Sequence, residues 1–99
     1  MTIQEVTEKI REQAGRIDPF GARLKFDFGE DIVYLDGTGN ENIVSNEDNE
    51  ADCVITTTLD TFDKISSGKL NPMMAMMTKK IRIKGDMGVA MRLQSLIKG

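Results

Sequence analysis

Apolar residues recur at helical spacing in the first fifteen positions of the chain. Thr2-Ile3-Gln4-Glu5 matches a capping box, in which a threonine and a glutamate three residues later satisfy amides at a helix start. Ile3, Val6, Ile10 and Ala14 follow on one face, and Gly15 ends the stripe. The pattern predicts an amphipathic first helix that ends near Gly15.

The middle of the chain alternates with the period of a β-strand. Leu24, Phe26 and Phe28 alternate with polar residues, so the first strand has one apolar face. After a turn at Gly29-Glu30, residues 31–36 predict its antiparallel partner, and residues 43–45 predict a short third strand. Residues 51–57 alternate again. The pattern therefore predicts four strands in this part of the chain.

After Thr58 the apolar period changes from that of a strand to that of a helix. Leu59, Phe62 and Ile65 lie three residues apart, and Ser66-Ser67-Gly68 ends this helix. Asn71-Pro72 predicts a short helix over residues 73–77, because asparagine caps well and proline suits the first helical position. Residues 80–84 alternate as a fifth strand, and residue 86 caps a final helix that extends toward residue 99.

Segregated strands and helices are typical of the α+β class, with helices laid over a mostly antiparallel sheet. A length of 99 residues fits one domain, over residues 1–99, with one modest core. No apolar run approaches the roughly 18 residues of a membrane span, and the start of the chain lacks the apolar stretch of a secretory signal. We therefore expect a soluble, cytoplasmic protein.

The residue inventory for catalysis is small. The chain has no histidine and one cysteine, which excludes Ser-His-Asp and Cys-His nucleophile pairs and almost every zinc site. Cys53 is expected to be a small buried hydrophobic side chain. Gly37-Thr38-Gly39 lacks the third glycine of a dinucleotide-binding loop, and Glu41 stands where an EF-hand loop requires glycine. We expect no catalytic residue, no metal site and no cofactor.

Charge is segregated along the chain. Residues 27–63 contain eleven acidic residues and no Lys or Arg, whereas residues 64–99 contain eight basic residues and a single acidic one, Asp86. Such segregation can orient a protein against an anionic lipid surface or a charged partner, but two solvated faces that attract each other are the simpler interpretation. No aromatic residues stand among the basic ones at 79–84, so no nucleic-acid partner is expected.

Methionine is concentrated in the predicted C-terminal helices. Six of the seven methionines lie between positions 73 and 91. Flexible thioether side chains repack around differing apolar shapes, which suits a promiscuous binding surface. A methionine stripe at helical spacing is also typical of an ordinary core, so the residues alone leave both interpretations open.

Three motifs in the last third of the chain carry a family resemblance: Gly68-Lys69-Leu70-Asn71-Pro72, Lys80-Ile81-Arg82-Ile83 and Gly85-Asp86-Met87. They resemble a helix start, the last strand and the closing helix of the sterol carrier protein family, the small non-specific lipid-transfer domain. Two positions depart from that family. Thr78 stands where it usually has glycine, and the last three residues are not the tripeptide that directs relatives to peroxisomes.

The resemblance implies a five-stranded sheet with helices covering one face and an apolar tunnel between them that holds fatty acid, fatty acyl-CoA, phospholipid or sterol. It implies no enzymatic activity. From motif position and apolar facing, we expect the tunnel wall to comprise Phe26, Phe28, Ile32, Phe62, Leu70, Met73, Met74, Met77, Met91 and Leu93, with Gln94 near a polar head group.

The basic residues of the fifth strand have a second predicted role. We expect Lys79, Lys80, Arg82 and Lys84 to draw the protein toward anionic membranes or acyl-CoA phosphates. Two other functions stay open: a structural or interaction module that uses the methionine-rich surface as a protein interface, and an accessory domain that presents acyl-CoA to a partner enzyme.

Overall fold

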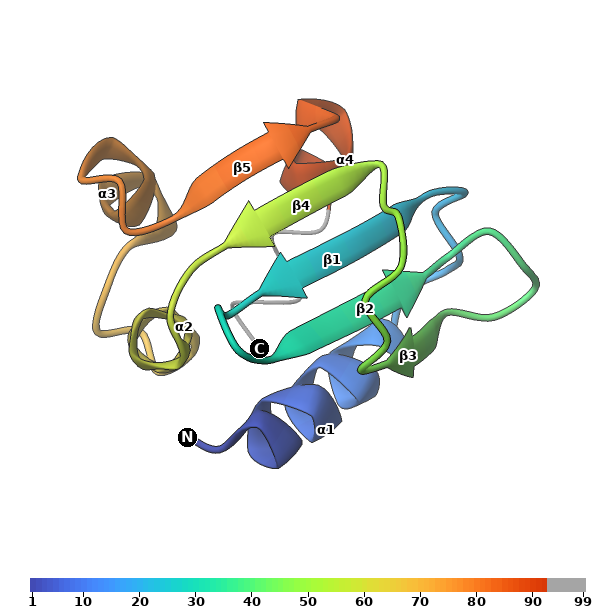
Figure 1. Cartoon of the computed structure of the whole chain (residues 1–99), viewed down its shortest axis with the longest axis horizontal. Helices are drawn as coiled ribbons and strands as arrows, with labels where there is room; N and C mark the ends of the chain where they lie inside the picture. Colours follow the sequence, from blue (N-terminus) through green and yellow to red (C-terminus); the bar gives the residue numbers. More distant parts are fainter. Residues whose placement is uncertain (93–99) are drawn as a thin grey trace.

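A computed structural model describes residues 1–92 as a five-stranded sheet with four helices around it (Figure 1). The elements, in chain order, are α1 (Ile3–Ala14), β1 (Arg23–Asp27), β2 (Ile32–Asp36), β3 (Ile43–Ser45), β4 (Cys53–Thr56), α2 (Leu59–Ser66), α3 (Pro72–Met77), β5 (Arg82–Gly85) and α4 (Met87–Arg92). This order confirms the predicted α+β class. No helix of the described range is long and apolar enough to cross a bilayer.

The strands lie in the order β3-β2-β1-β4-β5. All neighbouring pairs are antiparallel except β1 with β4, which are parallel, so the sheet is mostly antiparallel, as predicted. The parallel pair requires the chain to pass from β3 across the sheet to β4 (Figure 1). The Tyr34 hydroxyl donates to the Glu50 carbonyl at 2.6 Å, and Lys25 Nζ lies 2.7 Å from Asp48 Oδ1, which anchors this crossing loop to the face away from the core.

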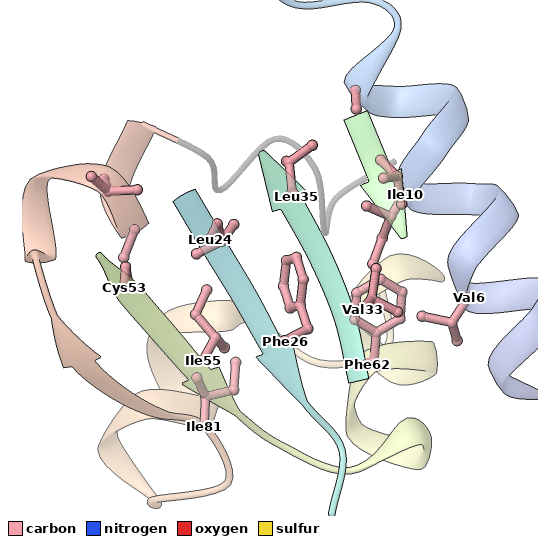
Figure 2. Packing of buried hydrophobic residues seen from close by; sticks show 14 of the residues in the cluster. Val6, Ile10, Leu24, Phe26, Val33, Leu35, Cys53, Ile55, Phe62 and Ile81 are labelled. Carbon is pink, nitrogen blue, oxygen red and sulfur yellow. The ribbon is translucent and has the colours of Figure 1, made fainter. Parts of the chain in front are cut away.

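The register places one continuous row of apolar side chains on the core face of the sheet. Leu24 lies between Leu35 and Cys53, and Phe26 lies between Val33 and Ile55. All six are buried. Val6 and Ile10 of α1 and Phe62 of α2 pack against this row (Figure 2). Ala75 of α3 and Val89 and Ala90 of α4 belong to the same cluster, so the core lies between the sheet and all four helices.

Side-chain caps begin the helices as the sequence predicts. Both hydrogen bonds of the capping box between Thr2 and Glu5 are present at α1. Asn71 Oδ1 accepts from the Met73 amide at 2.8 Å, and Asp86 Oδ1 accepts from the Gly88 amide at 2.9 Å. These bonds satisfy amides that have no partner inside the helix.

The turn after α3 is formed by a lysine in a left-handed conformation. Thr78 has φ −91°, which any residue can adopt, so the absence of glycine there leaves the turn intact. Lys79 has φ +61°, and the amides of the next two residues both donate to the Ala75 carbonyl, at 2.8 and 3.2 Å. These bonds end α3 and direct the chain into β5.

Candidate functional site

An apolar groove lies where α3, β5 and α4 meet. Its lining consists of Ile55, Pro72, Met76, Ile81, Ile83, Met87, Ala90 and Met91. No lining residue carries a charge or a polar side chain. Its volume is about 50 Å³ when only the space that a water molecule can enter is counted.

The floor of the groove follows from the alternation of β5. Ile83 lies directly opposite Ile55 of β4, on the core face of the sheet. Arg82 and Lys84 alternate with it and are exposed. The same alternation that builds an apolar floor therefore places two cations on the other face of the sheet.

The walls of the groove come from two short helices. Met87, Ala90 and Met91 of α4 are spaced at i, i+3 and i+4, which brings them to one face of the helix. Pro72 and Met76 of α3 are four residues apart and form the other wall. Gly85, which connects β5 to α4, has φ +103°, and a Cβ at this position would lie 2.3 Å from the Asp52 carbonyl oxygen. Only glycine lets α4 begin so close to β4.

Three aromatic rings pack beside the groove. Phe26 and Phe28 are stacked at 6.2 Å, and Phe62 meets them edge to face at 6.1 and 5.8 Å. Phe26 is the register partner of Ile55, so this aromatic cluster adjoins the groove floor. The space between the sheet and α2 is filled by these side chains.

The structure brings together the three phenylalanines that the sequence assigned to the ligand site. Ile32 and Leu70, which were assigned to the same site, lie elsewhere. Ile32 pairs with Asp27, so it lies on the opposite face of the sheet from Phe26. There it lines a polar hollow together with acidic residues of the β1–β2 turn. Leu70 is half-buried in the connection between α2 and α3 and lines a separate hollow.

The predicted methionines have different places. Met73, Met74 and Met77 of α3 are 61%, 52% and 75% exposed and do not line the groove. Met91 lines the groove and is 70% exposed. Leu93 and Gln94 lie outside the described residues. That these residues wall a ligand site stays a prediction.

Sequence reasoning missed most of the groove. Met76 and Met87 were visible as part of the methionine cluster, but nothing in the sequence separated them from the other methionines. Ile81 and Ile83 had a clear signal, because they occupy the apolar positions of an alternating strand. The alternation therefore marked Ile81 and Ile83 as the apolar face of the fifth strand, although the sequence did not assign them to a ligand site.

The basic residues beside the groove have no acidic partners among residues 1–92. Lys79, Lys80, Arg82 and Lys84 are all exposed, and no carboxylate in this range lies within 4.0 Å of their side-chain nitrogens. Lys64 does have an ion pair, 3.1 Å from Asp60, within α2. Lys64 with Asp60 is therefore the only ion pair between residues 27–63 and residues 64–92.

Cys53 is fully buried under α4, as predicted. Burial raises the pKa of its thiol, and the negative charge of Asp86 raises it further. A raised pKa keeps the sulfur protonated and unreactive near neutral pH. In the part of the chain that the structure describes, no three Cys, Asp or Glu side chains cluster as metal ligands.

The model of the SCP-2 sterol transfer family matches residues 3–98, so the chain belongs to that family. The chain is 40% identical to chicken sterol carrier protein 2 over 104 residues, covering 97% of this chain and 19% of that protein. It is 41% identical to human sterol carrier protein 2 over 58 residues, covering 59% of this chain and 11% of that protein. It thus spans one tenth to one fifth of these curated relatives.

A solved structure shares the whole fold. The structure of sterol carrier protein 2 from Aedes aegypti, in complex with the C16 fatty acid palmitate, aligns with a TM-score of 0.75 at 23% sequence identity. The alignment covers 98% of this chain and 96% of that one. This similarity confirms the five-stranded α+β fold.

Proposed function

We propose that this chain binds and transfers a lipid with a long acyl chain, which enters between α3 and α4. The observation that carries the proposal is the groove itself, whose eight lining residues are all apolar. Support comes from the family and from the mosquito member of the same fold, which is described as a palmitate complex. A cytoplasmic location and a single domain over residues 1–99 belong to the same proposal.

The proposal requires α3 and α4 to separate. The groove admits about 50 Å³, whereas pockets for small ligands measure roughly 300–1,000 Å³. Opening an unfilled apolar cavity of about 300 Å³ would cost ~7 kcal/mol. Burying an acyl chain of about sixteen carbons contributes up to ~12 kcal/mol before association costs are subtracted. The ligand can therefore offset the opening.

The proposed site extends from the groove into the aromatic cluster. Ile55 connects the two, because it lines the groove and lies beside Phe26 in the sheet. Movement of α3 and α4 away from the sheet would let an acyl chain reach Phe28 and Phe62, which sequence reasoning also selected. Lys79 and Lys80, which follow α3, are candidates to contact a carboxylate or an acyl-CoA phosphate at the mouth.

A thermal melt with palmitate tests the proposal. A ligand at 100 times its dissociation constant stabilises the folded protein by about 2.7 kcal/mol, which raises Tm by roughly 10 °C or more for a domain of this size. The Met91→Asp variant places a carboxylate at the groove and is expected to lose most of this increase. The matched control is Ile43→Asp, because Ile43 is also largely exposed but lies on β3, at the opposite edge of the sheet. A delipidated sample whose Tm ignored palmitate would overturn the proposal.

A further inference from the structure

Helix α3 is a surface helix without a polar side chain. Its sequence is Pro-Met-Met-Ala-Met-Met, and three of its methionines are more than half exposed. Met73, Met74 and Met77 fall on one side of the helix, while Ala75 is fully buried on the other. Helices that are apolar on all sides are normally buried in a core or in lipid. The exposed side of α3 therefore has the composition of a helix face that is normally buried against protein or lipid.

Cations surround α3 in the chain and in the fold. Lys69 precedes it and Lys79 and Lys80 follow it, and all three are exposed. Arg82 and Lys84 continue the series along β5, the edge strand beside α3 (Figure 1). No carboxylate among residues 1–92 forms an ion pair with any of these five side chains. A surface that covers α3 would meet these five positive charges. Such a surface is therefore expected to carry negative charge.

Helix α1, at the other edge of the sheet, has the opposite character (Figure 1). Val6, Ile10 and Ala14 of its apolar stripe are buried in the core, and Ile3 is partly buried. Two cations at this edge have partners, since Arg11 pairs with Glu8 of the same helix and Arg16, just after the helix, pairs with Glu12. Apolar exposure and unpaired positive charge therefore coincide around α3 and not around α1.

We propose that α3 inserts Met73, Met74 and Met77 into the surface of an anionic bilayer while the surrounding four lysines and one arginine bind the lipid phosphates. Apolar side chains at the acyl boundary with basic residues at head-group level are typical of interfacial helices. A second copy of the chain fits this surface less well, because it would bring five like charges toward five others. The inference rests on the proposed lipid-binding function, because Pro72 and Met76 of the same helix line the groove and would lie next to the acyl chains.

A single tryptophan tests the insertion, because the chain contains none. The Met77→Trp variant is mixed with vesicles of phosphatidylcholine alone or with about 30% phosphatidylglycerol, and Ile43→Trp serves as the matched control on the opposite edge. We expect the emission of Met77→Trp to move to shorter wavelength only with anionic vesicles and to be quenched by brominated acyl chains. The control is expected not to respond. The response is expected to weaken in 1 M salt, where the screening length is about 3 Å.

Vesicle sedimentation of glutamine variants adds a readout that does not depend on tryptophan. Lys79→Gln with Lys80→Gln is expected to lower vesicle affinity by about 25-fold, since each basic residue near an anionic surface contributes a factor of about five. The control, Lys9→Gln with Arg16→Gln, removes the same charge from α1 and the turn that follows it, and is expected to retain near-normal affinity.

The outcomes separate this inference from the proposed function. Absence of an emission shift, equal shifts at both positions, or equal effects of the two double variants would overturn bilayer insertion through α3. A shift of Met77→Trp at high protein concentration without vesicles would also overturn it, because the occupant would then be another protein molecule. Palmitate binding by the wild-type chain in vesicle-free buffer is measured separately, so failure of one hypothesis does not imply failure of the other.

Discussion

The helices at the two edges of this sheet both carry apolar side chains, but these side chains are covered to different degrees. In helix α1, which lies beside β3, the side chains of Val6 and Ile10 are completely buried. Helices α3 and α4, beside β5, leave five methionines between 45% and 75% exposed. An apolar stripe in the sequence therefore identifies a face that avoids water, but it does not identify what covers that face. At one edge the cover is the core, and at the other we propose that it is lipid.

Polar contacts explain why the first edge is closed. Asn46 Nδ2 donates to the Thr7 hydroxyl at 3.0 Å, and Asn42 Nδ2 donates to the Ala14 carbonyl at 3.1 Å. These bonds link α1 to the segments on both sides of β3. Helix α3 is half as long, and it is joined to the start of β5 by backbone bonds to the Ala75 carbonyl. The second edge, where Ala75, Val89 and Ala90 belong to the core, is the one at which the proposed function requires helices to move.

The largest expected difference between the two edges is in stability. Ile10→Ala in α1 is expected to lower the free energy of unfolding by about 2–5 kcal/mol, because it leaves a cavity in a fully buried site. Met77→Ala in α3 is expected to change it by less than ~0.5 kcal/mol, because that side chain is 75% exposed. Urea melts of both variants measure the difference. Equal losses would show that α3 contributes to the core as α1 does.

A smaller effect is expected where α4 is attached to the sheet. Gly85→Ala is expected to destabilise the fold by about 2 kcal/mol, because the left-handed backbone disfavours a side chain and the added Cβ meets the Asp52 carbonyl. Gly21→Ala is the matched control, since Gly21 also has a positive φ, +73°, but open space around its Cβ position. Chemical denaturation that found equal costs would mean that α4 does not need this close contact with β4.

The smallest expected effect is at the end of α3. Lys79 adopts the left-handed conformation, which costs a non-glycine residue about 1–2 kcal/mol. Lys79→Gly is therefore expected to stabilise the fold by up to ~1 kcal/mol, once the greater freedom of glycine in the unfolded chain is subtracted. Lys80→Gly, where the backbone has no positive φ, is expected to destabilise it slightly. A lower Tm for Lys79→Gly would contradict this account of the turn.

Local patterns predicted the elements of the fold but not how they meet. Alternation located β1, β4 and β5, apolar segments next to turn signals located β2 and β3, and the caps at Thr2, Asn71 and Asp86 located three helix starts. The central parallel pairing of β1 with β4 was not predicted, because strand neighbours are chosen by contacts far apart in the chain. The segment at residues 31–36 is apolar on both faces, so its pattern could not show that Ile32 lies on the opposite face from Phe26.

The candidate site was less predictable for a related reason. Helical spacing places Met73 and Met77 on one face and Met76 on another, but it does not say which face meets the sheet. That choice depends on the turn at Lys79 and on burial of Ala75, which are properties of the folded chain. The facing of the β5 residues was easier to predict from the sequence, because a strand has two faces and the apolar face must turn toward the core.

The methionine methyl groups allow the most direct test of lipid binding in the groove. Methionine methyls labelled with carbon-13 give one NMR signal each, and addition of palmitate to the delipidated chain is expected to shift those of Met76, Met87 and Met91, which line the groove. Met1, at the start of the chain, is expected to keep its signal and serves as the internal control. Signals from the three groove methionines that stayed unchanged while palmitate bound elsewhere, or did not bind, would contradict the account.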